Sequence, residues 1–163
     1  MDYHFTPITD FEARTVLSWR YPFLESPFDL DDLDDDIAAL LAPAYHYFAA
    51  RNHDGELVGF CCFGEDAQVP GGDYALPALD VGMGLRPDLT GRGLSHDFFQ
   101  AVLAWGVALF APECYRATVA AINVRSQGMV ARAGFLITQR FHAQSGKPEE
   151  FIVLLKAVAG ADE

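Results

Sequence analysis

The chain has 163 residues, of which 51% are hydrophobic and 21% are charged. A chain of this length and composition can bury a sizeable core, so we expect a single domain over residues 1–163. The formal net charge of −12 argues against a nucleic-acid binder or a protein of anionic membranes, because both need a basic surface. The charge is uneven. Residues 1–36 contain ten acidic residues and two arginines, a net of −8, whereas residues 81–140 contain six arginines and three acidic residues, a net of +3.

Composition narrows the class further. No apolar run reaches the roughly 18–20 residues that a membrane helix needs, and the first five residues lack the regions of a signal peptide. The three cysteines, Cys61, Cys62 and Cys114, have neither the number nor the spacing of a disulfide framework or a zinc motif. The five histidines form no helical ligand pair. We therefore expect a cytoplasmic protein with reduced thiols and no metal, either a monomer or a homodimer.

The first part of the chain predicts one strand and two helices. In order, these are a strand His4–Ile8, a helix Phe11–Trp19, a loop Tyr21–Leu30 with two prolines, and a helix Asp34–Leu41. Asp10 stands directly before the first helix and is a suitable N-cap. The acidic residues in the first turn of the second helix suit the helix dipole.

From Tyr45 onward the hydrophobic period indicates strands and two further helices. The predicted elements are the strands Tyr45–Ala50, Leu57–Phe63 and Ala78–Leu85, the helix Ser95–Phe110, the strand Arg116–Ile122, the helix Val124–Ala133, and the strands Phe135–Phe141 and Glu150–Lys156. The helix Ser95–Phe110 has a wide apolar face of Phe98, Val102, Trp105 and Leu109. The order β-α-α-β-β-β-α-β-α-β-β predicts a mixed α/β domain with one dominant sheet.

The segment Leu85–Ser95 leaves a predicted strand and enters the longest predicted helix. Glycines allow such a loop to turn its N–H groups into one concavity, and the helix N-terminus adds partial positive charge, so the segment predicts a phosphate site. Arg86 and Arg92 add positive charge there. Neither a dinucleotide fingerprint nor a Walker motif is present. The alternative is a loop that only needs tight turns.

Two motifs extend this interpretation. The segment Asp80–Ser95 resembles the fourth strand, pyrophosphate loop and third helix of the GNAT superfamily of acetyl-CoA-dependent N-acetyltransferases, and Asn123–Phe135 resembles that family's Asn-x-x-Ala-x-x-x-Tyr-x-x-x-Gly-Phe segment. The element order also matches. The resemblance implies an α+β GNAT fold, with a mixed, mostly antiparallel sheet of about seven strands flanked by four helices, and with the fourth and fifth strands splayed apart. It also implies acetyl-CoA as cosubstrate and acetyl transfer to a primary amine.

The resemblance assigns a set of cofactor-binding residues. These are Met83, Gly84, Leu85, Arg86, Thr90, Gly91, Arg92, Gly93, Leu94, Ser95 and Asn123. The backbone of Met83–Leu85 would bind the pantetheine, with Gly82 and Gly84 allowing close approach. Asn123 has an alternative role as a turn or N-cap residue. Ser95, where relatives carry Gly or Ala, can serve as a helix N-cap.

Catalysis is less well assigned. Some relatives use a carboxylate on the fourth strand as general base, and Asp80 is the matching candidate. The alternative is that Asp80 begins the strand and is solvated. Val130 stands where many relatives carry the Tyr that protonates the CoA thiolate, and valine cannot donate a proton. Water, Tyr115 or Ser126 would then supply that proton, or turnover would be slow.

On the acceptor side, the resemblance places Trp19, Tyr21 and Phe28 as substrate residues beside the acidic residues of 29–36. Such a surface favours a cationic amine, for example a polyamine, an amino sugar or a basic peptide terminus. The alternative is a solvated acidic face. Two other functions remain open from the sequence: a GNAT-fold module that binds or senses acyl-CoA with little transferase activity, and a phosphate-binding protein unrelated to CoA.

Overall fold

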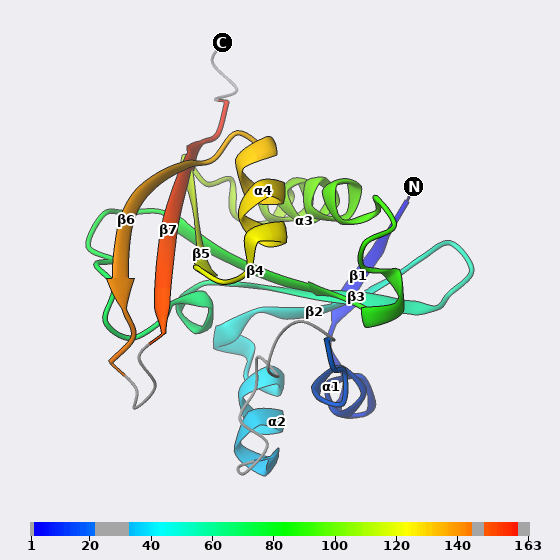
Figure 1. Ribbon diagram of the computed structural model, residues 1–163. Helices are drawn as coiled ribbons and strands as arrows, with labels where there is room; N and C mark the ends of the chain where they lie inside the picture. Colours follow the sequence, from blue (N-terminus) through cyan, green and yellow to red (C-terminus); the bar gives the residue numbers. More distant parts are fainter. Residues whose placement is uncertain (1, 22–32, 145–148, 160–163) are drawn as a thin grey trace. The chain divides into compact units, whose positions relative to one another are not determined.

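The computed structural model describes residues 2–21, 33–144 and 149–159, and these residues contain seven β-strands and four α-helices (Figure 1). In chain order they are β1 His4–Pro7, α1 Asp10–Leu17, α2 Leu33–Leu41, β2 Tyr47–Arg51, β3 Leu57–Phe63, β4 Leu79–Leu85, α3 Ser95–Phe110, β5 Cys114–Ala120, α4 Val124–Arg132, β6 Leu136–His142 and β7 Glu150–Ala157. The strand order is β1-β2-β3-β4-β5-β7-β6. The predicted element order and the mixed seven-stranded sheet are therefore confirmed.

The described chain forms two compact units. The first comprises the residues up to Cys62 together with Met83–Val102, and the second comprises Phe63–Gly82 together with the residues from Leu103 onward. Because β4 and α3 run from one unit into the other, the carboxyl end of β4 and the amino end of α3 both belong to the first unit.

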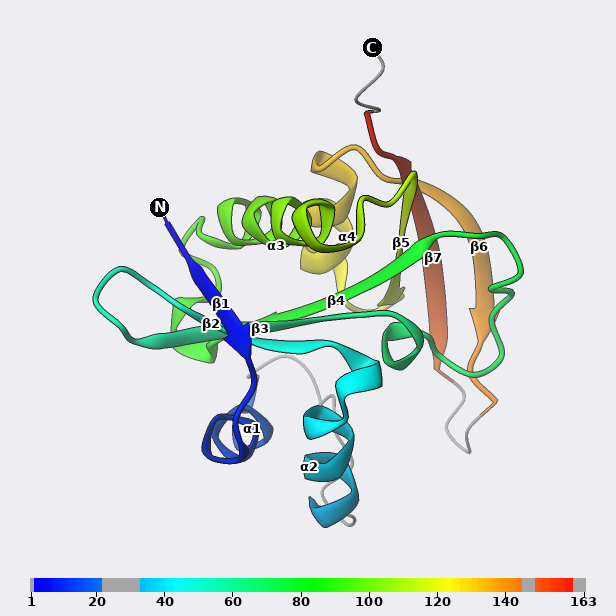
Figure 2. The same ribbon diagram turned by 180° about the vertical axis from the view of Figure 1, so that it is seen from behind.

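In the first unit, β1, β2 and β3 pair antiparallel. A tight turn joins β2 and β3: the Asn52 side chain accepts from the N–H groups of Asp54 and Glu56, and Gly55 has φ +82°. Helices α1 and α2 lie on one side of these strands, and the first half of α3 lies on the other (Figures 1 and 2). Neighbouring β3 residues follow this division. The Phe60 ring lies beside Trp19, whereas a Cβ at Gly59 would meet Phe98 of α3.

Helix α1 begins differently from the prediction. Its N-cap is Thr9, not Asp10. The Thr9 hydroxyl accepts from the Glu12 N–H at 3.2 Å, and the Glu12 carboxylate accepts from the Thr9 N–H at 3.0 Å, which together form a capping box. Glu12 is buried and also pairs with Arg51 of β2 at 2.8 Å, so the cap connects the helix to the strand.

In the second unit, β7 pairs antiparallel with both β5 and β6, and β4 pairs parallel with β5 through Leu79 and Asp80. The two faces of β5 have different environments. Tyr115 is buried beside Phe135 and donates to the Leu103 carbonyl of α3 at 2.6 Å. The next residue, Arg116, points to the opposite face, where residues 64–78 cover the strands.

Two sequence expectations about these elements are wrong in detail. β5 starts at Cys114 and ends at Ala120, two residues before the predicted limits at both ends. The buried stripe of α3 contains Phe98, Phe99, Val102 and Leu103, while Leu109 is 44% exposed. Cys61 and Cys62 are buried thiols that form no disulfide bond, and burial raises the pKa of the Cys61 thiol well above its usual value. Among the helices that the structure describes, none is long and apolar enough to cross a membrane.

Candidate functional site

The loop between β4 and α3 has the backbone geometry that its sequence predicts. Gly91 and Gly93 have φ +75° and +77°, a left-handed conformation that favours glycine, and a Cβ at Gly93 would meet nothing within 4 Å. A short 3-10 turn at Pro87–Leu89 precedes them. At the N-terminus of α3, the Phe98 N–H donates a backbone hydrogen bond to the Leu94 carbonyl. The N–H groups of Ser95 and the next two residues lie in the first turn, so they have no partner within the helix. The helix begins at Ser95, so Ser95 is not its N-cap.

The two arginines predicted to serve this loop have different environments. Arg86 donates to both oxygens of Asp88, at 2.6 and 3.2 Å, and to the Leu57 carbonyl. This hydrogen bonding raises the pKa of Arg86 and lowers the pKa of Asp88. Arg92 is exposed. The charge of Arg86 is thus largely neutralised locally, which leaves Arg92 as the cation placed to serve an anion at this loop.

The carboxyl end of β4, where Met83–Leu85 were assigned to the cofactor, is held by side chains of the first unit. The Tyr21 hydroxyl donates to the Leu85 carbonyl at 2.8 Å. A Cβ at Gly84 would overlap the ring of Phe60. Glycine at position 84 is thus explained by this ring, rather than by the close approach of a ligand.

Asp80 is neither solvated nor free. It is 3% exposed and accepts two hydrogen bonds from Arg116, at 2.6 and 2.7 Å, and one from the Gln68 amide at 2.9 Å. The bond to Asp80 raises the pKa of Arg116, and the Tyr74 ring lies over the guanidinium at 4.8 Å. The expectation of a solvated Asp80 is wrong, and this geometry counts against the general-base prediction, because a base needs a lone pair that the amine can reach.

Arg116 and Gln68 were not singled out from the sequence. One signal could have found Arg116, since it is a lone cation in an otherwise uncharged strand and a buried charge needs a partner. The partner could not be identified from spacing alone, because Asp80 and Arg116 become neighbours only through the parallel register of β4 and β5.

Asn123 caps α4. Its side chain accepts from the Ser126 N–H at 3.1 Å, so the N-cap role given as its alternative is confirmed.

Val130 lies in α4 and is 3% exposed, which means that the position matched to the family's Tyr belongs to a packed core. The Tyr115 hydroxyl is also buried and bonded to a carbonyl, so it does not fit the proton-donor role. Ser126 is half-buried.

The acceptor residues are only partly described. Trp19 is half-buried, with its ring 6.2 Å from that of Phe60, and the Tyr21 hydroxyl is bonded to the Leu85 carbonyl of β4. Phe28 and the acidic residues of 29–32 lie outside the described residues. Asp34 and Asp35 at the start of α2 are exposed. The structure therefore brings Trp19 and Tyr21 together with the end of β4 in the first unit, whereas Asp80 and Asn123 belong to the second.

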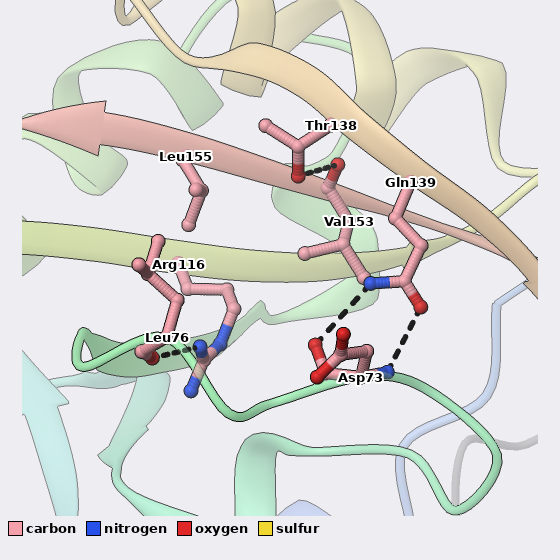
Figure 3. A pocket seen from close by; sticks show the side chains of 7 residues that line it. All are labelled: Asp73, Leu76, Arg116, Thr138, Gln139, Val153 and Leu155. Atoms are coloured by element: carbon pink, nitrogen blue, oxygen red, sulfur yellow. Dashed lines mark hydrogen bonds between the residues drawn. The ribbon is translucent and has the colours of Figure 1, made fainter.

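A pocket of about 190 Å³ lies in the second unit (Figure 3). It is lined by Asp73, Leu76, Arg116, Thr138, Gln139, Val153 and Leu155. The Gln139 side chain exchanges two hydrogen bonds with the Asp73 backbone, at 2.9 and 3.2 Å, and Arg116 donates to the Leu76 carbonyl at 2.7 Å. These bonds hold residues 73–76 against β5 and β6. None of the lining residues belongs to the site predicted from the sequence.

In the part of the chain that the structure describes, no group of three or more His, Cys, Asp or Glu residues is placed to hold a metal ion.

Comparison with solved structures supports the fold. Mutant forms of the spermidine/spermine N-acetyltransferase SpeG from Vibrio cholerae match 96% of this chain and 95% of their own, with 13% identity and a TM-score of 0.68. A chimera of SpeG and hSSAT matches 95% of both chains, with 13% identity and a TM-score of 0.73. A putative acetyltransferase from Acinetobacter baylyi covers 99% of this chain and 96% of its own, with 15% identity and a TM-score of 0.63.

Comparison at the level of sequence identifies the family. No curated protein sequence matches the chain. The family model described as an acetyltransferase (GNAT) domain matches residues 2–136, which include α1, β4, the glycine loop, α3 and α4. The chain therefore belongs to the GNAT acetyltransferases, a family of acetyl-CoA-dependent N-acetyltransferases.

Proposed function

We propose that this protein transfers the acetyl group of acetyl-CoA to a primary amine of a cationic small molecule or peptide. The observation that carries the proposal is the exposed loop of Gly91 and Gly93, which enters the N-terminus of the 16-residue helix α3. Free N–H groups and the helix dipole favour a pyrophosphate at such a point, and Arg92 adds a full positive charge. The family membership supplies the reaction class.

In the proposed reaction the amine nitrogen attacks the thioester carbon, the C–S bond breaks, and CoA leaves as a thiolate that takes up a proton. The pantetheine is proposed to run along Met83–Leu85, with a backbone N–H polarising the carbonyl. A free thiol of the cysteine type has a pKa of about 8.5, so the thiolate is a fair leaving group without a dedicated acid. Solvent or Ser126 is proposed to supply the proton. Because Asp80 is paired with Arg116, the amine is proposed to lose its proton to solvent.

The acceptor class rests on charge. Asp34 and Asp35 present exposed carboxylates on α2, and residues 1–36 carry a net of −8. A surface of this kind attracts an amine that remains cationic away from the reacting nitrogen. The structural neighbours named for spermidine acetylation make a polyamine the first compound to test.

The test is release of CoA thiol from acetyl-CoA, measured with spermidine, an amino sugar and a peptide with a basic N-terminus. Gly93→Glu should abolish both CoA binding and thiol release, because it puts a carboxylate into the phosphate site. Gly55→Glu is the matched control. Gly55 also has positive φ and open space around it, but it lies in the β2–β3 turn. Equal CoA affinity of the two variants by calorimetry would overturn the loop assignment.

A second function, an acyl-CoA-binding or sensing module, is favoured by one observation. Val130, in the position of the family's Tyr, is aliphatic and buried. CoA binding without thiol release for any amine would support the module. Thermal stabilisation by ATP or NAD as strong as that by CoA would instead indicate a phosphate site unrelated to CoA, since a ligand that binds the folded state raises its stability.

A further inference from the structure

The contact between the Tyr21 hydroxyl and the Leu85 carbonyl connects two segments that are 64 residues apart in the sequence. Tyr21 follows α1, whereas Leu85 is the last residue of β4. Burial raises the pKa of Tyr21 to about 12, so the hydroxyl keeps its proton and can donate throughout the neutral range. Since Leu85 is 4% exposed, its carbonyl has little access to water as a substitute donor.

Two further contacts fix the same end of β4. The Arg86 N–H donates to the Val58 carbonyl of β3 at 2.8 Å. Phe60, also on β3, places its ring where a side chain at Gly84 would stand. The peptide group between Leu85 and Arg86 is thus held at both ends: its N–H donates to β3, and its C=O accepts from the Tyr21 side chain.

We propose that Tyr21 is a positioning residue for acetyl transfer, whose hydroxyl sets the orientation of the last peptides of β4 rather than contacting the amine acceptor. The inference rests on the proposed function, because it assumes that the acetyl thioester binds along Met83–Leu85. Polarisation of a carbonyl by a backbone N–H depends steeply on distance and angle. Loss of the Tyr21 bond frees one end of a peptide plane, and the N–H groups next to it lose their fixed direction.

The test is Tyr21→Phe, with Tyr45→Phe as the matched control. Tyr45 belongs to the same unit and is half-buried, and no hydrogen bond of its hydroxyl is found among the described residues. We expect Tyr21→Phe to lower kcat about tenfold, as small misplacements of catalytic groups do. KM for the amine and Kd for CoA should stay within about twofold, because the loop and α3 bind the phosphates. Amide exchange at Leu85 and Arg86 should accelerate. Tyr45→Phe should change none of these quantities.

The alternative outcomes separate cleanly. A raised KM for the amine with unchanged kcat would overturn the inference and restore Tyr21 as an acceptor residue. Faster amide exchange with unchanged kcat and KM would also overturn it, because the role would then be structural only. Failure of the unmodified protein to bind CoA would overturn the proposed function itself, whatever the variants do.

Discussion

Two arginines, one in each unit, have opposite environments. Arg92 of the first unit is exposed in a loop, whereas Arg116 of the second is buried. Arg116 forms an ion pair with Asp80, donates to the Leu76 carbonyl and lies over the Tyr74 ring. Both belong to the segment whose excess of arginine suggested an anion site, but of the two only Arg92 has a guanidinium free to meet one. Net charge over a stretch of sequence thus measures composition. Pairing and burial decide which of its charges can act on a ligand.

The largest expected effect tests the buried side of this comparison. Asp80→Ala leaves the Arg116 charge buried without its partner, and we expect a loss of about 3–5 kcal/mol of unfolding free energy. The exposed pair of Arg14 and Asp10 provides the control. Arg14→Ala breaks a pair that water already screens, so it should shift the denaturation midpoint little. The measurement is urea denaturation of both variants.

The activity of a milder variant, Asp80→Asn, decides what else this residue does. If Asp80 only holds Arg116, the folded variant keeps its kcat and the pH profile of kcat. A large fall in kcat at full folding, with loss of the acidic limb of the profile, would show that Asp80 is a base after all.

Val130→Tyr gives the next effect. Val130 is 3% exposed, so a tyrosine there has to displace its neighbours, and we expect a destabilisation of about 1–3 kcal/mol. Restored turnover with undiminished stability would mean that the ring finds room toward the cofactor, as in relatives that carry Tyr. Thermal denaturation and thiol release measured on the same sample distinguish the two results.

An alkaline titration tests the bond between Tyr21 and β4 in the first unit. The pKa of Tyr21 is raised to about 12 from its ordinary value of 10.0, so the folded state favours the protonated hydroxyl. Its contribution is complete below pH 10 and is lost as the pH rises toward 12, with an expected loss of about 2 kcal/mol. The unfolding free energy of Tyr21→Phe should fall less steeply over this window than that of the unmodified protein.

The smallest effects compare one helix cap in each unit. Thr9→Ala and Asn123→Ala each remove a side chain that accepts an N–H at the start of a helix, so each should cost about 1 kcal/mol. Only Asn123→Ala should also weaken CoA binding if Asn123 contacts the cofactor. Asn123→Ser, which keeps a capping oxygen, separates the two roles: calorimetry showing full CoA affinity in both variants would leave Asn123 as a cap alone.

The element order could be predicted because its signals are local. The turn at Asn52–Glu56, the glycine at 134 and the change of hydrophobic period all act within a few residues. The face of α3 could not be predicted in the same way. Val107 and Leu109 are as apolar as Val102, and only the packing of the helix decides that Val102 is buried while they are 41% and 44% exposed.

The site divides along the same line. The glycine loop was predictable, since its φ angles follow from residue type and its place before a helix from periodicity. The pairing of Asp80 with Arg116 and of Tyr21 with Leu85 was not, because each pair joins residues 36 or more apart through strand pairing and packing. Polar side chains near a motif are therefore the ones whose roles a sequence assigns least securely.

Phe60 and Gly84 share a single volume, one residue filling what the other leaves empty. We expect a larger residue at position 84 to be tolerated only together with a smaller residue at position 60. The two positions should therefore vary together among related sequences. A library that randomises both positions at once should recover folded pairs that no series of single substitutions would reach.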